Sequence, residues 1–444
     1  MAVGPGLLPL PLLPYLFPSP PYAHTLKAKK IISMTGIDDF NIIVTLLGGL
    51  VLGLGLCSKK LEKSPIPITL LALLIGILIG PEALDFVDLK QLGQQSTILE
   101  RLARLVLGIG LVSVALRIPK SYPRQNWRLM ITLVGLGMLL MWAISTALVY
   151  FILGIPFWLA ALIGAILAPT DPVAASPVVT GPVAKKNLPE RVRHAISFES
   201  GANDGLSYLF VFLPLLMLQK PETAISHWLT KTLLWEVLGA TIFGLLLGLG
   251  AGYLLRVAEK HSLIQKDWRL IYTVALSLLA VGGGKLINSD EVLVVFAAGV
   301  AFVQMVSEEE RGEEERGQEA ANRFFSYPIF TLLGTAIPWS GWWELGWSGL
   351  LLAAAILLLR RPPVLLLLRP LLPDLRSTKD ALFLGWFGPV AVAAIYYSSM
   401  AEHRLGEPLV WDVVSLVICA SAVAHGISST PLTRLYGKKR SAVT

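Results

Sequence analysis

About thirteen apolar segments of membrane-spanning length follow one another along the chain, separated by short loops rich in glycine, proline and charge. Of the 444 residues, 54% are hydrophobic and 15% are charged, which is more apolar surface than a soluble core could bury. We therefore predict an all-α polytopic membrane protein that interacts with a lipid bilayer. The segments lie at 37–57, 65–80, 97–118, 128–153, 156–179, 191–218, 232–255, 268–287, 290–306, 323–339, 343–368, 380–400 and 410–429.

Positive charge alternates between the loops. Loops after odd-numbered segments carry groups of lysine and arginine such as Lys185 and Lys186, whereas loops after even-numbered segments hold few, such as Lys90 and Lys285. Because lysine and arginine gather on the cytoplasmic side, this pattern predicts an external N-terminus and a cytoplasmic C-terminus. Residues 433–444 then form a basic cytoplasmic tail, and we expect the protein in the plasma membrane.

Four further features bear on the function and the organisation of the chain. The two cysteines, Cys57 and Cys419, are far apart and argue against a disulfide framework or a metal cluster. The net charge of +7 comes from loops rather than from a basic face, so we expect no nucleic-acid partner. Residues 1–36 contain many prolines and are predicted to be a disordered extension, with Met34 as an alternative start. The charged stretch 307–323 is expected to be a solvated connector, although a regulatory or cation-attracting loop is the alternative.

Helix-breaking residues occur inside the fifth segment, in "APTDPVAASPVV". Pro172 removes a backbone donor and crowds the preceding turn, so the helix should be interrupted around Thr170 and Asp171. The freed carbonyl and amide groups would then face an ion or water. The alternative is a simple kink that Thr170 and neighbouring helices stabilise.

The sixth segment is polar along one stripe, in "FESGANDG". Glu199 with Asn203, and Ser200 with Asp204, are four residues apart and therefore share one side of a helix. An ionisable group inside a membrane is costly unless it faces a cavity or a partner, so these residues are functional candidates. The glycines between them allow a second helix to come close.

A second interruption follows in the twelfth segment, where Gly385, Gly388 and Pro389 break "GWFGPVAVAAIYY". One broken helix in each half of the chain is typical of an inverted-repeat transporter, whose ion site lies where the two broken helices cross. We therefore predict a fold of about 13 transmembrane helices with two crossed, unwound helices.

Four motifs, "APTDPVAASPVV", "FESGANDG", "GWFGPVAVAAIYY" and "VAHGISSTPL", resemble signature segments of the cation:proton antiporter-1 family, the NhaP-like and fungal plasma-membrane sodium/proton antiporters. The resemblance covers nearly the whole chain from about residue 37, so residues 37–432 are predicted to be the exchanger domain. It implies a core domain packed on a dimerisation domain, a homodimer, and transport rather than enzymatic activity. It also implies no cofactor, because Na⁺, Li⁺ and H⁺ are the cargo.

The resemblance assigns ion and proton binding to six residues, with Asp204 matching the ion-binding aspartate. The other five are Asn203, Thr170, Asp171, Ser200 and Glu199. Oxygen atoms of Asp204, Ser200 and Thr170 would form a site for Na⁺, together with a freed carbonyl and water. Burial would disfavour the charged form of Asp204, so that it holds either a cation or a proton.

One position departs from the family pattern. Many members have arginine after the Gly-Pro of the twelfth segment, where this chain has Val390. Arg361, in "LLLRRPPVLLLL", is our candidate counter-charge for Glu199, and the alternative is an arginine that extends to the cytoplasmic interface. His425 is a candidate for pH sensing, with a histidine that bonds a carbonyl at a helix end as the preferred alternative.

The residues thus predict exchange of Na⁺ or Li⁺ for H⁺. Because Asn203 is neutral, Asp204 would be the one exchanging group, and electroneutral exchange of one proton per cation is expected. A potassium-selective antiporter is the nearest alternative. A cation channel is a more distant alternative, because the sequence shows no repeated segment that could form a carbonyl selectivity filter. An intramembrane aspartyl protease is another, but it would need Tyr-Asp and Gly-x-Gly-Asp contexts that the sequence does not have.

Overall fold

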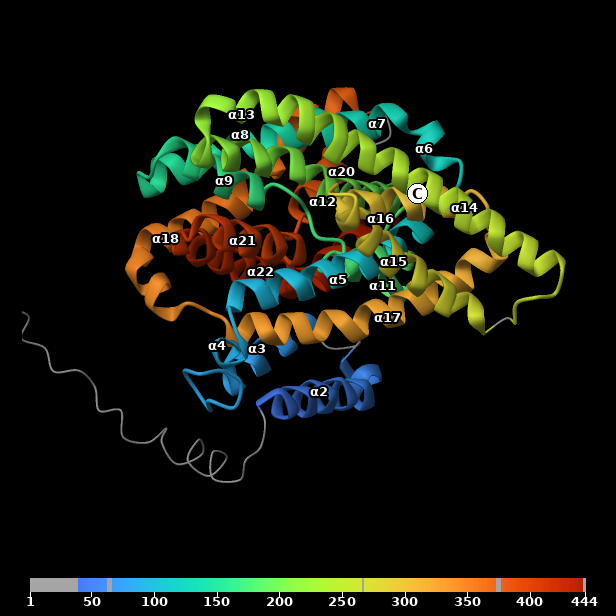
Figure 1. Cartoon of the computed structure of the whole chain (residues 1–444), viewed down its shortest axis with the longest axis horizontal. Coiled ribbons are helices and arrows are strands. Elements are labelled where there is room, and N and C mark those ends of the chain that lie inside the picture. The colour runs from blue at the N-terminus through green and yellow to red at the C-terminus, as the bar shows by residue number, and fades with distance from the viewer. Residues whose placement is uncertain (1–38, 62–65, 266, 373–376, 442–444) are drawn as a thin grey trace, which may run out of the picture.

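The computed structural model describes residues 39–61, 66–265, 267–372 and 377–441, and over these residues it is entirely helical (Figure 1). The predicted extension at 1–36 and the last three residues of the predicted tail lie outside them. The α-helices are α2 Asp39–Leu61, α3 Ile68–Ile79, α4 Leu89–Leu92, α5 Gln95–Arg117, α6 Tyr122–Gln125, α7 Trp127–Ile131, α8 Met138–Leu153, α9 Phe157–Leu167, α10 Ser176–Val179, α11 Gly181–Asn187, α12 Glu190–Gln219, α13 Pro221–His227, α14 Ala240–Lys260, α15 Trp268–Leu286, α16 Glu291–Val303, α17 Glu308–Thr335, α18 Trp339–Leu359, α19 Pro362–Leu368, α20 Thr378–Trp386, α21 Val392–Leu405 and α22 Pro408–Ser441. The π-helical stretches η1 Thr132–Gly137 and η2 Trp228–Gly239 join α7 to α8 and α13 to α14, and the 3₁₀ turn η3 Arg369–Leu371 follows α19.

Each of the thirteen predicted segments overlaps at least one of these helices. Within the described part of the chain, seven helical stretches are long and apolar enough to cross a membrane by themselves, and three shorter apolar helices accompany them. The chain is therefore a multi-pass integral membrane protein. The number of thirteen spans stays a prediction, because several segments consist of helices that are too short to cross alone.

The helices pack as two bundles. In the first, α3, α5, α14, α15, α16 and α17 contact one another, and in the second α8, α9, α12, α18, α20, α21 and α22 do so. Figure 1 shows α17 lying beside α3 and α5, while α21 and α22 lie beside α18. The bundles meet where α12 and α21 pack on α5 and α16.

The second bundle is built from a repeat. A helix (α7 to α8), a broken segment (α9 with α10) and a helix (α12) recur in the same order as α18 with α19, a broken segment (α20 with α21) and α22. The order of elements therefore matches the predicted repeat. In the predicted numbering seven segments separate the starts of the two triplets, and an odd number of crossings gives the second triplet the opposite orientation.

The broken helices end where the sequence predicts. Helix α9 ends at Leu167, just before Pro169, and regular helix resumes at Ser176; helix α20 ends at Trp386, just before Pro389, and α21 starts at Val392. Glycines bring α12 close to α16, since a Cβ on Gly205 would lie 2.9 Å from the Cα of Leu293. This close approach fixes the height at which α12 crosses between the bundles.

The charged stretch 307–323 differs from the prediction of a solvated connector. It forms the first half of α17, in which Glu314, Gln318 and Asn322 are buried along one face. Gln318 donates to the carbonyl of Ile109 at 3.1 Å and to Ser277 Oγ at 2.9 Å. Polar residues four apart thus form an inward-facing stripe with partners, so the high charge of this stretch does not mean solvation.

The predicted basic tail also begins later than expected. Helix α22 continues through residue 433 to Ser441, and Thr433 is fully buried. Tyr436 packs against Phe383 and hydrogen-bonds Asp380. The last turns of α22 therefore belong to the second bundle, because their inner face carries residues that pack.

Candidate ion-binding site

The breaks of the two interrupted segments lie against each other, joined by Asp171. Its N–H donates to the carbonyl of Pro389 at 2.8 Å. Its Oδ1 accepts the N–H groups of Val173 and Ala174 at 2.8 Å each, and its Oδ2 accepts the N–H of Val392 at 2.6 Å. Negative charge is stabilising at the amino end of a helix, so Asp171 caps both the turn that enters α10 and the start of α21.

The opposite ends of the breaks share one arginine. Arg360, in the short gap between α18 and α19, is 2% exposed. It donates to the carbonyls of Ala168 and Pro169 at 3.1 and 2.9 Å, and also to those of Leu167 and Gly388. These are the freed carbonyls at the carboxyl ends of α9 and α20, where positive charge is stabilising. Asp171 and Arg360 together neutralise all four half-helix ends.

Asn203 ties α12 to the first break. Its Nδ2 donates to Thr170 Oγ1 at 2.9 Å, and its Oδ1 accepts the N–H of Thr170 at 3.3 Å. Both side chains are buried. These hydrogen bonds place Asp204, the next residue of α12, at the level of the crossing.

Asp204 is the buried carboxylate that these contacts leave unsatisfied. It is completely buried, and neither Oδ1 nor Oδ2 has a hydrogen-bond partner. The charge that acts on it is the like charge of Asp171, whose own oxygens accept backbone N–H groups. An ionised carboxylate in this position is costly, so it requires a proton or a cation.

Backbone contacts hold the Asp204 turn in place. The hydroxyl of Tyr397, on α21, donates to the main-chain carbonyl of Asp204 at 2.8 Å. One turn earlier, Ser200 Oγ donates to the carbonyl of Ile196 at 2.7 Å, which leaves its lone pairs available. The hydroxyl oxygens therefore keep acceptor capacity on the polar stripe of α12.

Arg361 lies beside Glu199. Its Nη2 donates to Glu199 Oε2 at 2.7 Å, and the two side chains are 2% and 1% exposed. The arginine is fully inside the bundle rather than extended to the interface. Its guanidinium also packs on the break, where a Cβ on Gly388 would meet its Nη1 at 2.6 Å. The guanidinium of Arg361 thus lies beside Gly388, two residues before Val390, the position at which the family pattern has an arginine.

We predict strong coupling between Glu199 and Arg361. Glu199→Gln leaves a buried arginine without its counter-charge, which is expected to cost about 3–5 kcal/mol of folding stability. The double variant Glu199→Gln/Arg361→Met removes both charges and should regain much of that loss in thermal unfolding in detergent. An additive double variant would contradict the pairing. Arg323→Met, which breaks the exposed pair with Glu319, is the control and should cost about 0.3–0.5 kcal/mol.

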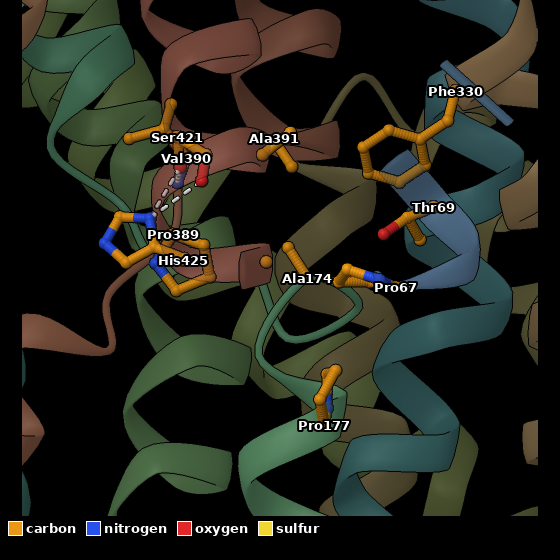
Figure 2. A pocket seen from close by; sticks show the side chains of 12 residues that line it. Pro67, Thr69, Ala174, Pro177, Phe330, Pro389, Val390, Ala391, Ser421 and His425 are labelled. Carbon is orange, nitrogen blue, oxygen red and sulfur yellow. Dashed lines mark hydrogen bonds between the residues drawn. The ribbon is translucent and has the colours of Figure 1, made fainter. Parts of the chain in front are cut away.

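His425 lies beside the second break, in a small pocket between the two bundles that Pro389 and Val390 also line (Figure 2). Its Nδ1 is 3.0 Å from Ser421 Oγ and 3.1 Å from the carbonyl of Ser421, and Ser421 Oγ accepts the N–H of Val390 at 2.9 Å. The preferred expectation of a helix-end histidine is wrong, because α22 continues well past it. Its pH-sensing role stays a prediction.

Two site residues were not found from the sequence. Arg360 stands next to Arg361 in the same apolar run, and that second buried charge was the signal that could have identified it. Tyr397 gave no signal, because an aromatic residue on an apolar helix is ordinary. The structure thus brings Thr170, Asn203 and Asp204 together with Asp171.

Crossed broken helices at the centre of a two-bundle membrane protein, with a buried carboxylate left unsatisfied beside them, define a secondary active transporter. Comparison with known proteins identifies the particular family. The family described as "Sodium/hydrogen exchanger, transmembrane" matches residues 42–435. The chain belongs to this family of transporters, as its motifs predict.

Two curated relatives and one solved structure give the extent of the similarity. Na(+)/H(+) antiporter 2 of Zygosaccharomyces rouxii is 29% identical over 408 residues, which cover 85% of this chain and 50% of that protein. The Na(+)/H(+) antiporter of Schizosaccharomyces pombe is 28% identical over 434 residues, which cover 91% of this chain and 92% of that protein. The sodium proton antiporter MjNhaP1 of Methanocaldococcus jannaschii at pH 8 has a TM-score of 0.67 at 21% identity, covering 89% of this chain and 99% of that one. The chain thus spans half the length of the first relative, and the solved structure shows the same fold.

Proposed function

We propose that the chain exchanges a monovalent cation, Na⁺ or Li⁺, for H⁺ across the membrane, with Asp204 binding the cation and the proton alternately. The observation that carries this proposal is the complete burial of Asp204 with both carboxylate oxygens unpartnered. A group in this state must be neutralised, and a proton and a cation compete for the same two oxygens. Competition for one site is what couples the two fluxes.

The other candidate groups support the site in different ways. Asp171 has its oxygens occupied by the amides of the two breaks, so it shapes the wall of the site rather than exchanging ions. Thr170 and Ser200 offer hydroxyl oxygens, and oxygen ligands suit a small hard cation. Na⁺ or Li⁺ would be held by Asp204, these hydroxyls, a freed carbonyl and water.

The stoichiometry follows from the neutral side chain beside Asp204. Asn203 is engaged with Thr170 and carries no proton to exchange. Glu199 is paired with Arg361, so its charge is already compensated. One proton per cation, and therefore electroneutral exchange, is the stoichiometry that these contacts support.

The charge pattern and the fold together support proposals for the membrane orientation and the assembly of the protein. The basic loops after the odd-numbered segments support a cytoplasmic C-terminus. We infer a homodimer in the plasma membrane, in which the first bundle supplies the dimer contact and the second moves relative to it. Such movement of one bundle against the other exposes a central site to each side in turn.

The test is collapse of an imposed pH gradient in proteoliposomes on addition of Na⁺, Li⁺, K⁺ or choline. We expect a response to Na⁺ and Li⁺, with a rate that does not change when valinomycin clamps the membrane potential. A response to K⁺ alone would establish the potassium-selective alternative. Cation flux without proton movement would indicate a channel, and inactivity with every cation would overturn the proposal.

A further inference from the structure

A second group of buried acids lies near the loops that the charge pattern predicts to be external, and the exchange mechanism does not use it. We call Glu236 of η2 with Asp290 and Glu291 at the start of α16 the outer acidic cluster. The three side chains are 6%, 0% and 2% exposed. The N–H of Asp290 donates to the carbonyl of Glu236 at 2.9 Å, so the backbone itself holds these two residues together.

Asp290 is the member without a compensating charge. Its Oδ1 accepts the N–H groups of Val292 and Leu293 at 3.0 and 3.2 Å and so caps α16. Its Oδ2 has no partner, and one carboxylate oxygen of Glu236, Oε2, has none either. The charges that act most strongly on Asp290 are the like charges of Glu291 and Glu236. A completely buried carboxylate among like charges calls for a bound positive charge.

The basic residues of the region are directed to the other two acids. Glu291 Oε1 lies 3.8 Å from Arg104 and 3.7 Å from Lys285, and it accepts the hydroxyl of Tyr396 at 2.9 Å. Lys231 lies 3.6 Å from Glu236 Oε1. The side chains of Lys231 and Lys285 are about half exposed, where water and salt weaken their charge. The free oxygens of Glu236 and Asp290 are therefore left for another cation.

The cluster lies next to the central site along α12. Gly205, the residue after Asp204, touches the backbone of Leu293 in the first turn of α16, and Tyr208 is one turn further out. The hydroxyl of Tyr396, on α21, donates to Glu291 Oε1 at 2.9 Å. Tyr397 in turn bonds the carbonyl of Asp204. Two adjacent tyrosines of α21 thus connect the cluster with the turn that carries Asp204.

We propose that the outer acidic cluster is a second binding site for the transported monovalent cation, which loads Asp204 from the external side. The proposal rests on the proposed cation exchange. A divalent metal fits less well, because no three acidic, histidine or cysteine side chains among the described residues stand in metal-ligand geometry. Two unpartnered carboxylate oxygens, completed by water, suit a monovalent ion that is bound weakly enough to leave.

The first test compares the KM for Na⁺ on the two sides of the membrane. Asp290→Asn keeps the carbonyl oxygen that caps α16 but removes the negative charge. In right-side-out membrane vesicles we expect the KM for external Na⁺ to rise about tenfold, the equivalent of one lost charge contact. In inside-out vesicles the KM for internal Na⁺ and the maximal rate should stay unchanged. Glu222→Gln, which removes an exposed acid from the first turn of α13, should leave both KM values as in wild type.

The second test measures binding directly. Purified Asp204→Asn protein lacks the central site, so it should retain saturable ²²Na⁺ binding that Asp204→Asn/Asp290→Asn loses. Glu236→Gln replaces Asp290→Asn if that variant does not fold. An external KM equal to that of wild type, an equal rise on both sides, or no residual binding in Asp204→Asn would overturn the outer site. Wild-type protein that moves no protons with any cation would instead overturn the proposed exchange.

Discussion

Asp204→Asn is expected to abolish cation-dependent proton flux, leaving proteoliposomes indistinguishable from protein-free ones. Asparagine has the shape of aspartate, but it can neither release a proton nor carry the charge that holds Na⁺. The side chain has no hydrogen-bond partner to lose. Removing an uncompensated buried charge should therefore leave the thermal unfolding temperature equal to that of wild type or higher. Loss of transport without loss of stability is the result that identifies an exchanging group.

A binding measurement separates this role from damage to the fold. Na⁺ should raise the unfolding temperature of wild-type protein, because a ligand that binds the native state stabilises it. It should leave the unfolding temperature of Asp204→Asn much less changed. Asp267→Asn, the same substitution at an exposed position before α15, is the control and should behave as wild type. Residual Na⁺-dependent proton flux in Asp204→Asn would show that another carboxylate exchanges.

Much of the site was predictable because its causes are local. Pro172 follows Pro169 by three residues and Pro389 directly follows Gly388, and such combinations strongly disfavour regular helix, so both breaks could be placed from the sequence. Four-residue spacing on α12 put Asn203 and Asp204 on one polar stripe, and a hydrogen bond to Thr170 required only that the broken helix pass nearby. Local rules of this kind do not depend on how distant segments are arranged.

The parts that the sequence did not reveal depend on distant segments. Arg360 has backbone carbonyls as its partners, more than 190 residues away in the case of Ala168, and backbone atoms leave no pattern in a sequence. The inward stripe of α17 was hidden by its charge, since the partners of Gln318 come from α5 and α15. The outer acidic cluster likewise forms only when η2 and α16 meet.

The structure separates two tasks that charges perform at the crossing. Asp171 and Arg360 are satisfied by backbone groups, so they hold the broken helices in a fixed shape. Asp204 is left without partners at the same level of the membrane. Because the broken helices around Asp204 are held in a fixed arrangement, a cation and a proton bind the same carboxylate oxygens. This shared site is the condition for their competition.

Arg360 should therefore be the second residue whose substitution abolishes transport, in this case through loss of folding stability. Arg360→Met would remove the positive charge that faces the carboxyl ends of α9 and α20 and leave buried carbonyls without donors. We expect a stability loss of about 3–5 kcal/mol, as for removal of one partner from a buried charged network. In practice the variant should yield little monodisperse protein by fluorescence-detected size exclusion and show no transport.

Arg360→Lys tests whether geometry matters as well as charge. Lysine keeps the positive charge but has a single nitrogen, which cannot span carbonyls on two helices as a guanidinium does. We expect folded protein with a lowered unfolding temperature and reduced exchange, whereas Arg369→Lys at an exposed position after α19 should match wild type. If Arg360→Lys exchanged ions as wild type does, charge alone would suffice at the crossing. If Arg360→Met were stable, the dipoles of the half-helices would need no neutralisation, and the frame assigned to Arg360 and Asp171 would be wrong.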